Sequence, residues 1–162
     1  MNFIIKLIAS FFFTGYFPAA SGTAASLLSV IIYYYLRMSP FVYLPFVFFL
    51  FLSGFAFSGR AQVLFQKKDS EKIVIDEAAS MSLVCMFTKG DYLLLACGFL
   101  FFRFFDIIKP PPIKRIEKIS GPKAVMLDDI AAALYAILLV LLVYRLQQAG
   151  ILPAVSIGAR PA

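Results

Sequence analysis

The feature that most constrains this chain is a run of 22 consecutive uncharged residues, Met38 to Gly59. At about 1.5 Å per helical residue, such a run can cross the roughly 30 Å hydrocarbon core of a bilayer. A second uncharged run, Ile130 to Tyr144, is followed by Arg145, whose long side chain can reach the membrane interface. The chain is 62% hydrophobic and 15% charged, against about 45–50% and about 25% for soluble domains. These values predict an integral membrane protein.

Two shorter apolar segments, Ala78 to Thr88 and Tyr92 to Phe102, have 11 residues each and are joined by Lys89-Gly90-Asp91. The turn residues between them predict a tight helical hairpin. Closer to the N-terminus, glycine, proline and hydroxyl residues between 15 and 23 interrupt another uncharged stretch. This interruption predicts a short N-terminal helix, a loop and a helix from about Ala24.

The predicted fold is an all-α, multi-pass membrane helical bundle. It has about four spanning or half-spanning helices and a short N-terminal helix, for which the sequence offers no signal-peptide cleavage pattern. We expect one membrane-embedded domain over residues 1–149, and a flexible tail rich in proline, glycine and alanine over residues 150–162.

The basic residues gather in two connections between apolar segments, and the net charge is +6. Because cytoplasmic loops of membrane proteins are enriched in lysine and arginine, both connections are expected on the cytoplasmic side. An even number of membrane crossings must then separate them, and the two helices of the hairpin supply that even number. Cations that flank apolar runs fit anionic lipid headgroups better than nucleic acid. The two clusters are Lys67, Lys68 and Lys72, and then Lys109, Lys114, Arg115, Lys118 and Lys123.

Histidine is absent, which excludes phosphohistidine intermediates, Ser-His-Asp triads and histidine-ligated zinc. The two cysteines, Cys85 and Cys97, lie in apolar segments and are interpreted as small buried hydrophobic residues. No covalent nucleophile is evident from these residues.

No acidic residue precedes Lys68. Of the nine acids, Asp91 and Glu117 are left out of the candidate group, and the other seven lie in or beside the two connections that carry the lysines. Carboxylates near a membrane are costly and commonly functional. Carboxylate oxygens bind Mg²⁺, and neighbouring lysine or arginine side chains can hold phosphate oxygens. Clustering alone leaves an equally strong alternative, in which these acids only pair with the lysines at the interface.

Two local patterns also have more than one interpretation. The segment Gly15 to Thr23 could cradle a phosphate with backbone N–H groups and hydroxyls, or Thr23 could be the N-cap of the following helix. Asp106 precedes Lys109-Pro110 and is expected near a helix C-terminus, where an aspartate is unfavourable. This position indicates either a function or an ion pair with Arg103, three residues earlier.

Three segments together resemble the phosphatidylglycerophosphatase A family. They run from Gly15 through Pro18-Ala19-Ala20-Ser21-Gly22-Thr23 to Leu27, from Lys68-Asp69 to Asp76-Glu77, and from Phe102-Arg103-Phe104-Phe105-Asp106 through Lys109-Pro110 to Met126-Leu127-Asp128-Asp129. The chain departs from the family pattern at Ser21 and Ser70, where the family usually has proline.

The resemblance implies a Mg²⁺-dependent enzyme of bacterial inner membranes that removes the phosphate monoester of phosphatidylglycerophosphate on the cytoplasmic face. Its partners are then the lipid substrate and the bilayer, with no nucleic acid. The implied metal ligands are Asp69, Asp76, Glu77, Asp106, Asp128 and Asp129, and the implied catalytic residues are Asp76, Glu77 and Asp69. The expected phosphate-binding residues are Ser21, Gly22, Thr23, Lys72, Arg103, Lys109 and Lys123.

Two alternatives come from other classes. A CDP-alcohol phosphatidyltransferase is also a membrane Mg²⁺ enzyme, but its Asp-Gly-x-x-Ala-Arg pattern with two further aspartates is absent from Asp128 to Ala133. A small transporter or scaffold would carry its acids in the middle of its spans, whereas here they lie near the ends. Both alternatives therefore rank below the lipid phosphatase.

Overall fold

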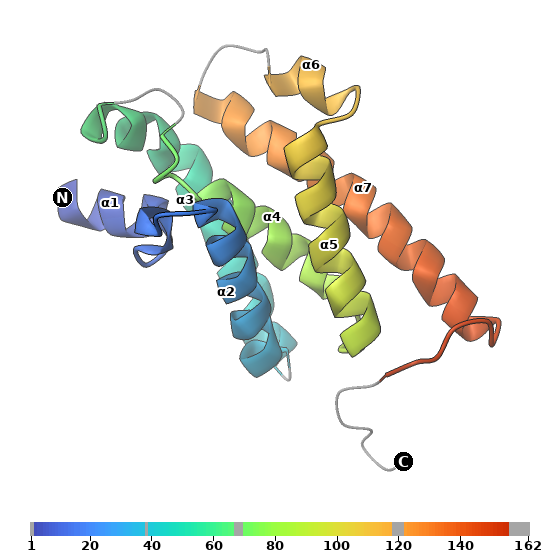
Figure 1. Cartoon of the computed structure of the whole chain (residues 1–162). Coiled ribbons are helices and arrows are strands. Elements are labelled where there is room, and N and C mark those ends of the chain that lie inside the picture. Colours follow the sequence, from blue (N-terminus) through green and yellow to red (C-terminus); the bar gives the residue numbers. More distant parts are fainter. Residues whose placement is uncertain (1, 38, 67–69, 118–121, 156–162) are drawn as a thin grey trace.

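The computed structural model describes residues 2–37, 39–66, 70–117 and 122–155, with the backbone alone at 117 and 122–125 (Figure 1). Within these residues every regular element is a helix, as predicted. The elements are α1 (Asn2–Ala9), the 3-10 helix η1 (Thr14–Tyr16), α2 (Ser21–Leu36), α3 (Pro40–Leu64), α4 (Ile75–Met86), α5 (Tyr92–Ile108), α6 (Ile113–Glu117) and α7 (Pro122–Gln148).

Two of the described helices, α3 and α7, are long and apolar enough to cross a membrane. Helix α3 contains residues 40–59 of the first uncharged run, and α7 contains all of the second. Large apolar side chains point outward from both, including Phe41 at 92% exposure and Leu138 at 65%. Exposure of such side chains to water would be unfavourable, whereas lipid accommodates them. The helices and their exposed faces indicate a membrane-associated protein. The other apolar helices are shorter, at 16 residues in α2, 12 in α4 and 17 in α5.

The short helix α4 lies at the centre of the bundle, in contact with α2, α3, α5 and α7. Most of its residues are buried, and many are small, among them Ala78, Ala79 and Ser82. Small side chains let neighbouring helices approach closely. The hydroxyl of Ser29 in α2 donates to the carbonyl of Ala78 at 3.1 Å, and Tyr43 Oη in α3 donates to the carbonyl of Ser82 at 2.8 Å.

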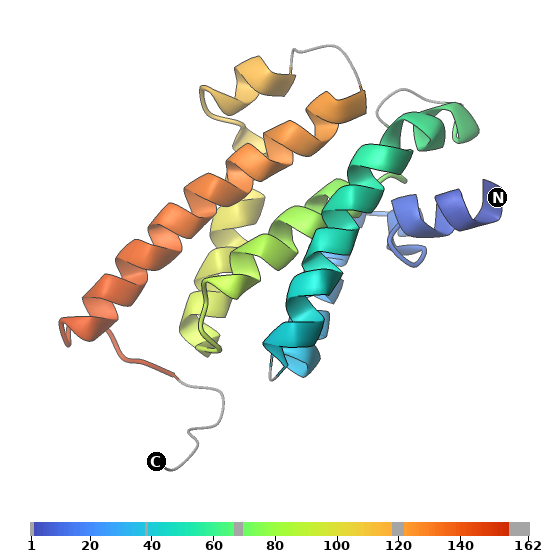
Figure 2. The same cartoon turned by 180° about the vertical axis from the view of Figure 1, so that it is seen from behind.

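The hairpin predicted around residues 89–91 is confirmed as the connection between α4 and α5. Lys89 and Gly90 both have positive φ, at 52° and 74°. Asp91 is the N-cap of α5, and its Oδ1 accepts a hydrogen bond from the backbone N–H of Leu94 at 3.0 Å. The hairpin returns the chain to the end of the bundle where α3 finishes and α7 begins (Figures 1 and 2). The basic connections after α3 and α5 therefore share one end, as expected.

The N-terminal segment differs in detail from the prediction. Helix α2 begins at Ser21 rather than Ala24, after Ala20 in the left-handed conformation with φ 54°, so Thr23 lies inside the helix and is not its N-cap. Helix α1 has eight residues, too few to span a bilayer at about 1.5 Å per residue. It packs on α3, and the carbonyl of Ala9 accepts the N–H of Val74, just before α4, at 2.9 Å.

The described part of the C-terminal tail lies against the hairpin. The backbone N–H of Val155 donates to Asp91 Oδ2 at 2.7 Å, and Tyr92 N–H donates to the Val155 carbonyl at 2.8 Å. This contact is at the end of the bundle opposite the basic connections (Figure 1).

Candidate metal and phosphate site

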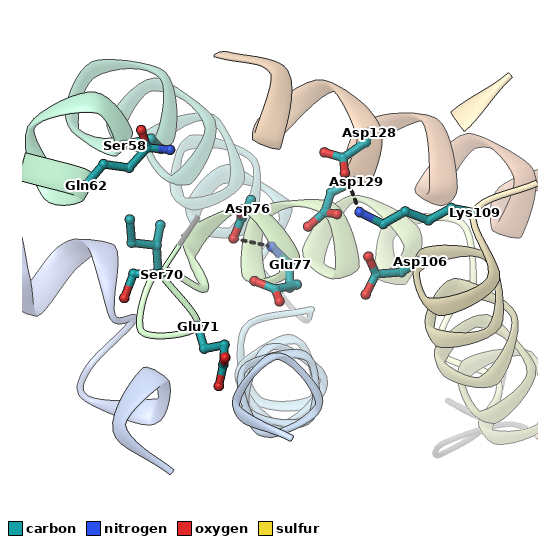
Figure 3. Close-up of a pocket in the computed structure, with 11 residues that line it drawn as sticks. Ser58, Gln62, Ser70, Glu71, Asp76, Glu77, Asp106, Lys109, Asp128 and Asp129 are labelled. Carbon is teal, nitrogen blue, oxygen red and sulfur yellow. Dashed lines mark hydrogen bonds and ion pairs between the residues drawn. The ribbon is translucent and has the colours of Figure 1, made fainter. Parts of the chain in front are cut away.

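A cavity of about 220 Å³ opens at the basic end of the bundle, between α3, α4, α5 and α7 (Figure 3). Its wall combines acidic side chains from three helices with one lysine and a few neutral polar groups. The lining residues are Ser58, Gln62, Ser70, Glu71, Ile73, Asp76, Glu77, Asp106, Lys109, Asp128 and Asp129.

Three carboxylates form the centre of this cavity. Asp76 and Glu77 lie in the first turn of α4, where the helix N-terminus favours negative charge, and Asp129 lies near the start of α7. One oxygen of each can be chosen so that all three atoms lie within 4.8 Å of one another. Asp76 and Asp129 are 3% and 5% exposed, so this negative charge is held away from solvent.

The electrostatics of the α4 pair reflect this crowding. Burial raises the pKa of Asp76 to about 6, against the opposing effect of its hydrogen bond from the Glu77 backbone N–H at 3.1 Å. Burial also raises the pKa of Glu77 well above its ordinary value, and the negative charges of Asp76 and Asp106 add to the shift. Buried carboxylates that repel one another in this way are stabilised by a bound cation.

Two cations flank the carboxylates, and each already forms an ion pair. Lys109, in the left-handed C-cap of α5, places Nζ 2.7 Å from Asp128 Oδ2. Arg103 Nη1 lies 2.7 Å from Asp106 Oδ2, three residues later in one helix. This ion pair is one of the two interpretations that the sequence left open for Asp106. The pairs fix the orientation of two acids beside the central group, and the charge of Arg103 also acts on Glu77, whose pKa it lowers against the effect of burial.

The residues present fit a divalent ion with oxygen ligands. Glu77 Oε2 and Asp128 Oδ1 are buried and have no hydrogen-bond partner among the described atoms. Buried carboxylate oxygens normally have a hydrogen-bond donor or a cation as partner, and a bound cation would supply one to both atoms. Several carboxylate oxygens, without histidine or cysteine in the cavity wall, are the ligand set that Mg²⁺ prefers.

Gly22 brings α2 against this group. A Cβ at this position would collide with Glu77 Oε1 and would lie 3.2 Å from Arg103 Nη1. Only glycine therefore allows the α2 backbone to approach the Glu77 carboxylate in its observed position.

The other predicted phosphate ligands lie outside the cavity wall. Ser21 Oγ donates to the carbonyl of Glu71 at 2.8 Å, and Thr23 lines an apolar groove on α2. Lys72 places its ammonium over the Tyr16 ring, 5.0 Å from the centroid. Asp69 and the side chain of Lys123 lie outside the described residues.

Sequence reasoning did not select four of the polar lining residues: Ser58, Gln62, Ser70 and Glu71. Ser58 and Gln62 are four residues apart and so share one face of α3, near its end. Two polar side chains at this spacing, at the end of an apolar run, are the sequence pattern from which their place in the cavity wall could have been predicted. Glu71 belonged to the acidic cluster, and Figure 3 shows it apart from the central carboxylates.

Comparison of the sequence with protein families and with individual proteins points to the same family. The family model described as phosphatidylglycerophosphatase A matches residues 7–144. A phosphatidylglycerophosphatase A of Haemophilus influenzae is 32% identical over 142 residues, covering 84% of this chain and 86% of the relative. The Escherichia coli protein of that name is 30% identical over 129 residues, covering 78% and 75%.

A further relative has a different name. A Bacteroides thetaiotaomicron protein, provisionally named a phosphatidylinositol-3-phosphatase, is 30% identical over 151 residues, covering 86% of this chain and 92% of the relative. No solved structure gives a significant match to the chain.

Proposed function

Because the chain belongs to the phosphatidylglycerophosphatase A family, we propose that it hydrolyses the phosphate monoester of phosphatidylglycerophosphate to give phosphatidylglycerol and inorganic phosphate. The observation that carries the proposal is the buried group of Asp76, Glu77 and Asp129 inside a cavity large enough for a phosphate group. An enzyme of this kind is a phosphoric monoester hydrolase.

Mg²⁺ is the proposed cofactor, held by Asp76, Glu77 and Asp129, with Asp106 and Asp128 at the edge of the same site. When bound, it supplies positive charge that offsets the phosphoryl oxygens and makes water easier to deprotonate. Asp69, in the connection before α4, stays a predicted member of the ligand set.

The chain's own residues then have distinct roles. Lys109 lines the cavity beside the carboxylates and is placed to contact a phosphoryl oxygen. Arg103, six residues earlier in the chain, lies outside the cavity wall and pairs with Asp106, which lines it. It stays a predicted phosphate contact. Glu77 Oε2, which has no partner among the described atoms, accepts the proton of the attacking water. That proton passes to the leaving glycerol oxygen as the P–O ester bond breaks. Gly22 keeps the Glu77 carboxylate in place from the side of α2.

The proposed location is the bacterial inner membrane, with the cavity facing the cytoplasm. The two basic connections follow α3 and α5, which both end at the cavity end of the bundle, and the hairpin lies at the other end (Figure 1). Enrichment in lysine and arginine is typical of the cytoplasmic side.

A second candidate substrate is a phosphoinositide, which the name of the Bacteroides relative favours. The two lipids share a diacylglycerol, a phosphodiester and a headgroup that carries a phosphate monoester. They differ in whether that headgroup is a glycerol or an inositol ring.

The test is phosphate release by the detergent-purified protein from phosphatidylglycerophosphate and, separately, from phosphatidylinositol-3-phosphate. Each assay is run with Mg²⁺ and with EDTA. We expect Mg²⁺-dependent release that is faster from phosphatidylglycerophosphate, and its loss in Asp76→Asn. Asp91→Asn is the matched control, because Asp91 lies at the opposite end of the bundle and its amide analogue keeps the oxygen that caps α5. The change gives up only the bond from the Val155 N–H, far from the cavity. Faster release from the phosphoinositide would reverse the substrate assignment, and no release from either would overturn the proposal.

A further inference from the structure

A group of cations and aromatic rings lies beside the cavity and has no role in the chemistry described above. Lys72 Nζ is 5.0 Å from the centroid of the Tyr16 ring and 6.0 Å from that of Phe65. Lys6 Nζ lies 5.7 Å from the same Phe65 ring. These four residues, Lys6, Tyr16, Phe65 and Lys72, are called the lysine–aromatic shelf. They bring α1, η1, the end of α3 and the connection before α4 to one place.

The four shelf residues include two lysines and no acid. The chain has no acidic residue before position 69. Within the part of the chain that the structure describes, the recorded ion pairs join Arg103 to Asp106 and Lys109 to Asp128, and neither involves a shelf lysine. Lys72 is exposed, and the ring of exposed Phe13 lies 5.9 Å from that of Tyr16, centroid to centroid. Lysines among exposed aromatic rings are typical of a surface at the level of lipid phosphates.

The shelf is continuous with the cavity. Ser70 and Glu71 line the cavity, and Lys72 follows them directly. The Glu71 carbonyl accepts from Ser21 Oγ at 2.8 Å, which fixes this connection against the start of α2. On the other side, a Cβ at Gly15 would collide with the Lys72 carbonyl oxygen, so η1 packs closely against the same residues.

An apolar groove of about 360 Å³ begins at this point and follows α2. Its wall includes Phe17, Ala20, Thr23, Ala24, Leu27 and Ile31. From Ala20 to Ile31 the helix rises about 16 Å, which is close to one leaflet of a hydrocarbon core about 30 Å thick. The wall has small side chains near the shelf and larger apolar ones further along α2, so the groove is suited to a hydrocarbon chain.

We propose that the shelf and the groove bind the lipid part of the substrate: the Lys72 ammonium, supported by Lys6, binds the phosphodiester of an anionic glycerophospholipid, and the α2 groove holds one of its acyl chains. This proposal rests on the proposed function, because it places the phosphate monoester of the same lipid in the carboxylate cavity. It assigns Lys72 to the phosphodiester rather than to the phosphate that is released. The binding energy of the lipid part then orients the monoester in the cavity.

The shelf can be tested by lipid binding in the absence of turnover. The probe is dioctanoyl phosphatidylglycerol, which has the phosphodiester and the chains but no monoester, titrated into detergent-solubilised protein in EDTA. We expect Lys72→Ala to weaken binding about fivefold, as for the loss of about 1 kcal/mol from one interfacial lysine. Lys72→Arg should restore most of the affinity. The control is Lys114→Ala, which removes an exposed cation of α6 and should leave the affinity unchanged.

The groove is tested by filling it. Ala24→Phe places a ring in the groove, and the matched control Ala96→Phe makes the same change on an exposed face of α5. We expect Ala24→Phe alone to weaken dioctanoyl phosphatidylglycerol binding, and neither variant to change competition by glycerophosphoglycerol, which lacks chains. Leu27→Trp fills the same groove and replaces Ala24→Phe if that variant fails to fold. If the wild type, Ala24→Phe and Leu27→Trp bind dioctanoyl phosphatidylglycerol with equal affinity, the acyl-chain assignment is overturned. If Lys72→Ala and Lys114→Ala change the affinity equally, the assignment of Lys72 to the phosphodiester is overturned.

These measurements separate this proposal from the proposed function. Loss of phosphatidylglycerol binding in Lys72→Ala and Ala24→Phe, in a protein that releases no phosphate, would support the lipid site and overturn the phosphatase. Mg²⁺-dependent phosphate release with unchanged phosphatidylglycerol affinity in both variants would support the phosphatase and overturn the lipid site.

Discussion

The Asp76 carboxyl group is buried, and burial raises its pKa to about 6, from 3.8 for an ordinary aspartate. A group whose pKa is higher in the folded protein stabilises the fold at low pH, and this contribution is lost as the pH rises through about 6. The metal-free protein is therefore expected to be more stable at pH 5 than at pH 7.5. Mg²⁺ binds the ionised form, so it should stabilise the protein mainly at the higher pH. Thermal unfolding with EDTA or Mg²⁺ at both pH values checks this, and a metal-free protein that is more stable at pH 7.5 would contradict it.

The same residue separates activity from stability. Asp76→Asn removes a buried charge, so the metal-free variant should unfold about 4 °C higher at pH 7.5 than the wild type. It should also lose activity by about 100-fold or more, because a central carboxylate is missing. Phosphate release and thermal unfolding, measured on one preparation, check both halves. A variant that lost stability and activity together would indicate a structural role for Asp76.

Gly22 gives a second prediction at this scale. Alanine would favour the helix by about 1 kcal/mol relative to glycine, so α2 itself should not be weakened. Its Cβ would collide with Glu77 Oε1 and force the carboxylate to move. We expect Gly22→Ala to lower kcat about tenfold or more, with thermal stability nearly unchanged. Full activity in this variant would show that the Glu77 position is not constrained by α2.

At the scale of elements, the position of the site depends on how closely α5 and α7 pack on α4. A Cβ at Gly98 in α5 would lie 2.9 Å from Val84 Cγ1 and 3.4 Å from Val140 Cγ2. Gly98→Val should therefore push α5 away from α4 and α7 and destabilise the protein by about 2 kcal/mol. The matched change Ala96→Val lies on an exposed face of the same helix and should have little effect. Valine has a higher helix propensity than glycine, so a loss of stability in Gly98→Val that Ala96→Val does not share reports the close packing of α5. Thermal unfolding of both variants measures this difference.

At the scale of the whole molecule, the two ends of the bundle differ. The cavity and the basic connections lie at one end, and the hairpin and the described part of the tail lie at the opposite end (Figure 1). We expect a cysteine at exposed Lys114 to react with a membrane-impermeant thiol reagent only after spheroplasts are permeabilised. A cysteine at Ile151, which is 67% exposed, should react in intact spheroplasts. The opposite labelling pattern would place the cavity on the outer side of the membrane.

The sequence by itself determined the helical class, the two long apolar helices, the hairpin and the group of acids. It could do so because these features depend on local periodicity, on the length of uncharged runs and on turn residues. The Arg103–Asp106 pair was also predictable, since its partners are one helical turn apart. Resemblance to a family pointed to the same acids and to the lipid substrate.

The tertiary structure alone decided which of those acids meet. Asp76 and Glu77 join Asp129 from a helix more than 50 positions later, and Lys109 pairs with Asp128 across 19 positions. Ser58 and Gln62 enter the cavity, whereas Lys72 turns to the Tyr16 ring beside it. Each of these outcomes depends on the angles and distances at which helices cross. Those are fixed by close contacts such as Gly98 on Val84 and Gly22 on Glu77, which join residues far apart in the chain and leave no local signal in it.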